Sequence, residues 1–196
     1  MTLHRIDADA VAPQAWRNGG GQTRELWRWP EQGPWQLRIS RADIDRDGPF
    51  SAFAEVQRWF AVLSGAGVEL QFGAIHHTLR PGDDALHFDG ALAPGCRLLD
   101  GPTQDLNLMA SAGTACMVRI EAGSAWTSSH AMRGLYTTVP GHWHCEGQGL
   151  QAIAAHSLLW DDAASPQPWR FDVDAAGARS GQPIGYWLAF TRMVLT

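Results

Sequence analysis

The chain has 196 residues, a length that suits one domain or two small domains sharing a core. Because 45% of the residues are hydrophobic and 18% are charged, the chain can bury a core, which excludes an intrinsically disordered protein. The formal net charge is -5, and all 15 basic residues are arginines, so nucleic acid and anionic membranes are poor candidates for partners. The lack of lysine also excludes Schiff-base chemistry and a P-loop lysine.

Two features of the sequence bear on the cellular compartment. No run of 18 apolar residues occurs, and residues 1–11 lack the apolar stretch of a signal peptide. The three cysteines, Cys96, Cys116 and Cys145, are far apart and form no CxxC pair. We therefore expect reduced thiols and a cytoplasmic protein without a membrane-spanning segment.

Short apolar runs separated by glycine and proline predict strands in chain order, beginning with residues 35–44. Residues 59–72 (WFAVLSGAGVELQF) predict a hairpin, with two strands joined by a tight glycine turn. Residues 76–88 predict a strand, a Pro-Gly turn and another strand. Further strands are expected within the segments 106–110, 115–120, 135–139, 150–160 and 184–196.

A hairpin followed by a strand that turns at Pro-Gly-Asp is a common order in cupin-type jelly rolls, and residues 137–160 repeat it weakly. We therefore predict an all-β bicupin, with two packed jelly-roll-like β-barrels in one compact chain. The N-terminal half would comprise residues 1–112, and a degenerate C-terminal half would comprise residues 113–196. Residues 161–183 are expected to form a loop or an irregular excursion.

The stretch WRNGGGQTREL, residues 16–26, places three consecutive glycines after Asn18. It matches neither GxxxxGK[ST] nor GxGxxG, so it does not predict a nucleotide site. One interpretation is a glycine-rich turn at the start of a sheet. The other is that bare backbone comes close to a ligand or to a second sheet.

Polar residues alternate with apolar ones along three of the predicted strands. Asp105, Asn107 and Met109 would share one strand face, as would Arg38 and Ser40. Arg58 would share a face with the apolar residues Phe60 and Val62. These polar groups either face solvent or line a barrel interior, where a guanidinium is the natural partner of a carboxylate.

Histidines suggest a metal site only weakly. His142, His144 and Glu146 would lie on one face of a strand, but Glu146 follows too soon for the usual cupin spacing. We therefore expect no metal and no cofactor. The sequence also lacks the GxSxG motif that forms the nucleophile elbow of serine hydrolases.

Four segments together resemble the HutD/Ves family: residues 16–26, residues 35–70, LRPGDDALHFDG (79–90) and CRLLDGPTQDLNLM (96–109). The resemblance implies a bicupin without metal that binds a small metabolite of histidine utilisation, with N-formylglutamate the suggested ligand. It also implies a role in restraining operon activity. The ligand-binding residues carried over from the family motifs are Trp16, Asn18, Gly20, Thr23, Arg38, Ser40, Arg58, Phe88, Asp105, Asn107 and Met109.

Two functions are open at this point. The first is a non-catalytic protein that senses a small anionic metabolite, with Arg58 as counter-ion and Asp105 as its internal partner. The second is a cupin-type enzyme, an isomerase or an amide hydrolase, with Asp105 as general acid or base. No second carboxylate lies near Asp105 on the same strand, so we favour the binding protein. The sequence leaves a homodimer open.

Overall fold

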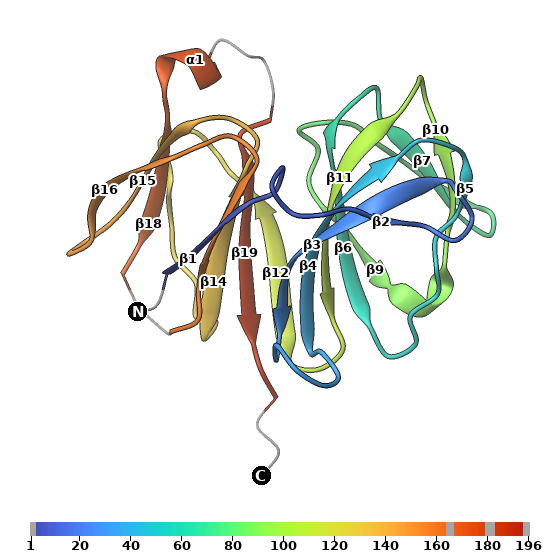
Figure 1. Cartoon of the computed structure of the whole chain (residues 1–196), viewed down its shortest axis with the longest axis horizontal. Helices are drawn as coiled ribbons and strands as arrows, with labels where there is room; N and C mark the ends of the chain where they lie inside the picture. The colour runs from blue at the N-terminus through green and yellow to red at the C-terminus, as the bar shows by residue number, and fades with distance from the viewer. Residues whose placement is uncertain (1–2, 164–166, 179–182, 194–196) are drawn as a thin grey trace. The chain divides into compact units, whose positions relative to one another are not determined.

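The computed structural model describes residues 3–163, 167–178 and 183–193. Within these residues the chain forms 19 strands, the 3-10 turn η1 (Gly90–Leu92) and the four-residue helix α1 (Ala175–Ala178). The prediction of an all-β fold is therefore confirmed. The chain divides into two compact units: residues 11–113 form the first, and residues 114–196 with those up to Ala10 form the second (Figure 1).

The first unit contains two antiparallel sheets. The larger has six strands in the order β2-β3-β4-β11-β6-β9, and the smaller has four in the order β5-β10-β7-β8. The strands of the larger sheet are β2 (Gln14–Ala15), β3 (Gly21–Trp29), β4 (Leu37–Ile44), β6 (Gln57–Ser64), β9 (Leu86–Asp89) and β11 (Thr103–Ala110). Those of the smaller sheet are β5 (Gly48–Pro49), β7 (Val68–Phe72), β8 (Ile75–Leu79) and β10 (Gly95–Leu98).

One hydrophobic core joins the two sheets of the first unit. Phe60 and Val62 on β6 belong to the same buried cluster as Val68 and Leu70 on β7. Side chains alternate between the two faces of a strand, so the residues that share this face of β6 also point inward. Arg58 is one of them, as the sequence pattern predicts.

The predicted hairpin at residues 59–72 is wrong. β6 pairs with β11 and β9, whereas β7 pairs with β10 and β8, so the two strands belong to different sheets. Gly65 and Gly67, with φ of 93° and 112°, turn the chain from one sheet into the other. The hairpin in this region joins β7 to β8 through Gly73.

The second unit also contains two antiparallel sheets, with the orders β1-β17-β14-β19-β12 and β13-β18-β15-β16. The first of these contains β1 (Leu3–Asp7), β12 (Thr114–Arg119), β14 (Met132–Thr137), β17 (Ser157–Asp161) and β19 (Gly185–Thr191). The other contains β13 (Ala125–Trp126), β15 (Gly141–Cys145), β16 (Gly149–Ile153) and β18 (Trp169–Val173). Large aromatic side chains fill the core of the second unit, among them Trp143, Trp169, Phe171 and Trp187.

Two sequence-based expectations about this unit need correction. The segment 161–183 is not irregular in its described part, because it contains β18 and α1. Trp169 and Phe171 alternate with Arg170 and Asp172 there, which is a strand pattern. A division at residue 112 would also assign β1 to the wrong half, since β1 pairs with β17 from Leu3 opposite Asp161 to Asp7 opposite Ser157. None of the helices in the described residues is long and apolar enough to cross a membrane.

Candidate ligand-binding site

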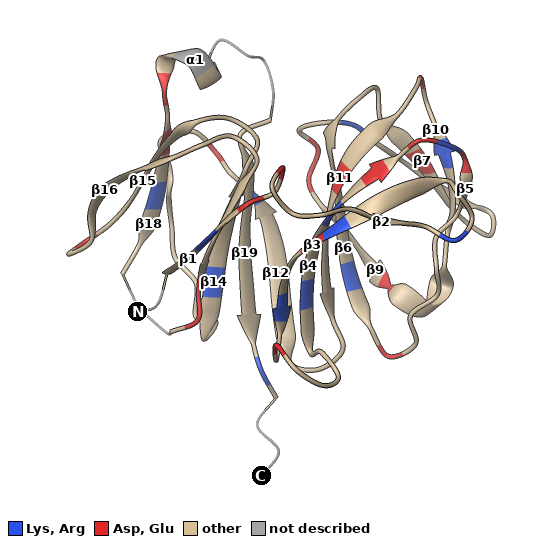
Figure 2. Cartoon of the chain, viewed as in Figure 1, with Lys and Arg blue, Asp and Glu red and all other residues tan. Residues whose placement is uncertain are grey.

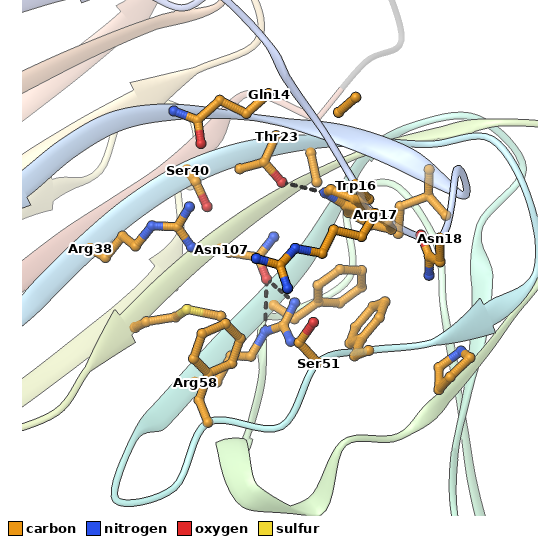
Figure 3. A pocket seen from close by; sticks show the side chains of 18 residues that line it. Gln14, Trp16, Arg17, Asn18, Thr23, Arg38, Ser40, Ser51, Arg58 and Asn107 are labelled. Atoms are coloured by element: carbon orange, nitrogen blue, oxygen red, sulfur yellow. Dashed lines mark hydrogen bonds between the residues drawn. The ribbon is translucent and has the colours of Figure 1, made fainter.

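The first unit encloses a cavity of about 660 Å³, within the range of small-molecule sites (Figure 3). Its walls come from β2 and the turn after it, from β3, β4, β6 and β11, and from the loop that follows β5. The lining residues are Gln14, Ala15, Trp16, Arg17, Asn18, Thr23, Arg38, Ser40, Ala42, Ile44, Pro49, Phe50, Ser51, Phe53, Arg58, Phe60, Asn107 and Met109.

Strand register explains why residues distant in sequence meet in this cavity. On β11, Asn107 lies opposite Ser40 of β4 on one side and opposite Phe60 of β6 on the other. Met109 lies in the same way between Arg38 and Arg58. Directly opposite residues of an antiparallel pair point to the same face, so the polar side chains of three strands converge.

Arg58 lies at the base of the cavity and is only 7% exposed. Its Nε and Nη2 donate hydrogen bonds to Oδ1 of Asn107 at 2.9 and 2.5 Å. Its Cζ lies 4.3 Å from the ring centroid of Phe50 and 5.6 Å from that of Phe88, which are cation–π distances. Burial and the charge of Arg38 lower the pKa of Arg58 to about 9, so the side chain is still a cation at pH 7.

Two further arginines line the same cavity. Arg38 donates from Nε to Oε2 of Glu25 at 2.7 Å and forms a partly buried ion pair. Arg17 is exposed at the rim, and Figure 3 shows its side chain extending into the cavity. In Figure 2 the arginines on β4 and β6 of the first unit are blue. No carboxylate occurs among the lining residues, so the cavity favours an anion.

The glycine-rich stretch forms the wall at the mouth. Trp16 donates from Nε1 to the hydroxyl of Thr23 at 2.7 Å, which fixes the indole ring over β3. The amide of Gly20 donates to Oδ1 of Asn18 at 3.0 Å, and Gly19 has a φ of 67°. A Cβ on Gly21 would lie 2.2 Å from the carbonyl oxygen of Asp43, so only glycine allows β3 this close to β4. The stretch is therefore a glycine-rich turn at the start of a sheet, and the close approach at Gly21 is to the neighbouring strand of the same sheet rather than to a second sheet.

Eight of the eleven residues predicted for the site line the cavity: Trp16, Asn18, Thr23, Arg38, Ser40, Arg58, Asn107 and Met109. Gly20 does not line it, although its amide holds Asn18 in place. Phe88 lies directly opposite Arg58 on the neighbouring strand β9, and its ring packs against that of Phe72.

Asp105 is the third predicted residue outside the lining. It is fully buried and lies opposite Val62 of β6. Its Oδ2 accepts a hydrogen bond from the Thr103 hydroxyl at 2.8 Å. Burial raises the pKa of Asp105 well above its ordinary value, against the opposing influence of Thr103 and Arg58. Asn107, not Asp105, accepts the hydrogen bonds of Arg58. Asp105, the predicted internal partner, acts on Arg58 through its charge alone, which raises the pKa of the guanidinium against the effect of burial.

Sequence reasoning did not select several lining residues, notably Arg17, Phe50, Ser51 and Phe53. Arg17 could have been found, because it stands between Trp16 and Asn18 in a stretch already singled out. The loop residues 50–53 carry no periodic pattern, and only the fold brings them to the cavity.

The histidines of β15 do not form a metal centre with Glu146. His142 and His144 share one half-buried face of β15, but Glu146 lies beyond the end of the strand and is exposed. The Nε2 of His144 lies 3.8 Å from Oδ2 of Asp172. The described residues contain no group of three or more His, Cys, Asp or Glu side chains that could hold a metal ion.

Two units, each built of two antiparallel sheets, define the class of protein: the chain is a bicupin. The nickel-bound pirin YhhW of Escherichia coli has this fold, with a TM-score of 0.62 at 9% identity, over 98% of this chain and all of that one. HutD from Pseudomonas fluorescens SBW25 is more similar, with a TM-score of 0.83 at 24% identity, again over 98% of this chain and all of that one.

The chain belongs to the HutD family, whose model matches residues 8–179. Protein Ves of Citrobacter koseri is 31% identical over 164 residues, which is 82% of this chain and 84% of that protein. An uncharacterized 21.2 kDa protein in the hutC 3' region of Pseudomonas putida is 41% identical over 110 residues. That match spans 55% of this chain and 57% of the Pseudomonas putida protein.

Proposed function

We propose that this protein is a non-catalytic binding protein of the cytoplasm that takes a small carboxylate such as N-formylglutamate and thereby modulates histidine utilisation. The observation that carries the proposal is the convergence of Arg17, Arg38 and Arg58 on one cavity whose lining contains no carboxylate. A guanidinium is a planar fork of donors that matches a carboxylate, so this charge pattern suits a ligand with one or two carboxylates.

The dimensions and polarity of the cavity support the same ligand class. Arg58 is the counter-ion at the base, and Ser40 and Asn107 supply hydrogen-bonding groups beside it. Apolar walls, including Ile44, Phe53 and Met109, suit the methylene chain of an amino-acid derivative.

One relative gives further support. The Pseudomonas putida relative is named for its place beside hutC. The catalytic alternative loses its proposed acid or base, because Asp105 lies outside the cavity lining.

Calorimetric titration tests the proposal. N-formylglutamate should bind, and the melting temperature should rise with its concentration, because a ligand at 100 times its Kd stabilises the folded state by about 2.7 kcal/mol. No formate or glutamate should accumulate when the complex is incubated at high protein concentration. Absence of binding would refute the proposed ligand, and stoichiometric turnover would refute the non-catalytic role.

A further inference from the structure

The orientation of the Asn107 amide is fixed by the protein itself. Arg58 has only donors, and it directs two of them, Nε and Nη2, at Oδ1 of Asn107. The side-chain oxygen must therefore face Arg58, and the NH2 group must face away from it. Figure 3 shows the Asn107 nitrogen on the side of the amide away from Arg58, within the ring of lining residues.

This arrangement has a consequence for the charge at the base of the cavity. The amide satisfies two donors of Arg58 without neutralising it, because the Asn107 oxygen carries no formal charge. In the described part of the chain no carboxylate accepts a hydrogen bond from Arg58. The base of the cavity therefore offers a cation from Arg58 and N–H donors from Asn107, beside the Ser40 hydroxyl.

The second unit shows the other solution to burying an arginine. Arg133 lies on β14, between β17 and β19, as Arg58 lies on β6 between β9 and β11. Its neighbour on β17 is Asp161, whereas the neighbour of Arg58 on β9 is Phe88. Arg133 is 1% exposed, donates to the carbonyl oxygen of Gln167 at 2.6 Å and lies 4.6 Å from the ring centroid of Trp169.

We infer that Asn107 is the specificity-determining residue for ligand charge: its amide leaves Arg58 cationic and adds a donor, so that the cavity selects an ionised carboxylate over a neutral amide of the same shape. This inference rests on the proposed function and goes beyond it, because it assigns the selection to one side chain. A carboxylate at position 107 would pair with Arg58, and it would replace the donor by an acceptor that repels an anion.

The test uses glutarate and glutaramide, which share one carbon skeleton and differ in charge. Calorimetry at a fixed, low ionic strength should show that the wild-type chain binds glutarate at least tenfold more tightly than glutaramide. Asn107→Asp should weaken glutarate binding by about a hundredfold, which corresponds to about 2.8 kcal/mol of binding free energy. It should also abolish the preference for glutarate.

Gln57→Glu is the matched control, since it makes the same change from an amide to a carboxylate next to Arg58 in the sequence, at a residue that does not line the cavity. A glutamate there still accepts the hydrogen bond of His87 Nε2. Because position 57 is exposed, solvent screens the added charge, and glutarate binding should weaken by no more than about threefold.

Circular dichroism and the melting temperature establish that the variants fold. Should Asn107→Asp not fold, Ser40→Asp places a carboxylate on the directly opposite position of β4 and should have the same effect. The inference is overturned if the wild-type chain shows no preference for glutarate, or if the folded aspartate variant keeps that preference. It is also overturned if Gln57→Glu abolishes the preference equally. Titration of the wild-type chain with N-formylglutamate tests the proposed function separately.

Discussion

At the scale of single residues, Arg58 dominates the site because it is both buried and charged. Removing it while keeping the protein folded separates binding from stability. Arg58→Ala should weaken the binding of N-formylglutamate by about ten- to a hundredfold, since a charge-assisted hydrogen bond contributes about 1.5–3 kcal/mol. Arg58→Lys should recover only part of the loss, because a point charge replaces the fork. Equal affinities of the three proteins in calorimetry would remove Arg58 from the site.

Asp105 gives a prediction about pH. A group with a raised folded-state pKa contributes stability that is fully present below its unfolded pKa and is lost as the pH rises through the folded value. Ionisation of Asp105 should therefore lower the free energy of unfolding progressively above about pH 4, the ordinary aspartate range. Asp105→Asn, which can still accept the Thr103 hydrogen bond, should flatten this dependence.

Urea denaturation at pH 5, 7 and 9 measures the effect. As the pH rises, the free energy of unfolding of Asp105→Asn should increase relative to that of the wild-type chain. A variant that is less stable by the same margin at every pH would mean that the Asp105 carboxylate is ionised and stabilises Arg58.

Strand alternation was enough to predict which side chains of β4, β6 and β11 face inward. Arg38, Ser40, Arg58 and Asn107 were found in this way. Alternation gives the face of a strand but not the depth along it, and that is why Asp105 was misplaced. It lies two residues from Asn107, about 7 Å along β11, where Val62 rather than the cavity faces it.

At the scale of elements, the close approach of β3 to β4 depends on one glycine. Gly21→Ala would place a Cβ 2.2 Å from the carbonyl oxygen of Asp43, which is backbone and cannot rotate away. We expect a loss of about 2–3 kcal/mol in the free energy of unfolding, the upper part of the range of about 1–3 kcal/mol for an overpacked site. Urea denaturation provides the measurement.

Gly20→Ala is the control for this substitution. A Cβ on Gly20 would lie 3.4 Å from Oδ1 of Asn18, an ordinary van der Waals distance from the end of an exposed side chain. Gly20→Ala should lower the free energy of unfolding by less than about 1 kcal/mol. Similar losses in the two variants would contradict a special role for Gly21 at the approach of the two strands.

Local sequence predicted most strands but not their partners. Val-Leu-Ser-Gly-Ala-Gly-Val reads as a hairpin because glycine permits a tight turn. The same glycines also permit a corner between two sheets, and Gly65 and Gly67 serve that purpose here. Pairing between β6 and β11 joins residues that are 40 to 53 positions apart in the sequence, and no short-range pattern specifies it.

At the scale of the whole molecule, the two units differ in what surrounds their buried arginine. Arg58 faces a cavity, whereas Arg133 has Asp161 beside it and lines neither this cavity nor the one of about 320 Å³ in the second unit. We expect one ligand per chain. Calorimetry with N-formylglutamate should give a stoichiometry near one, and Arg133→Met should leave the affinity within about threefold of the wild-type value. Two equivalent sites would contradict this asymmetry.

The pairing of β1 with β17 also affects the order in which the protein can fold during synthesis. β1 leaves the ribosome well before its partner strand, because β17 begins about 150 residues later. At about 5–20 residues per second, β1 waits roughly 8–30 s for its partner strand. The first unit, residues 11–113, is continuous and can complete its sheets within that interval. The nascent chain thus carries an unpaired β1 ahead of a folded first unit, and the second unit takes up this strand only after β17 has been made.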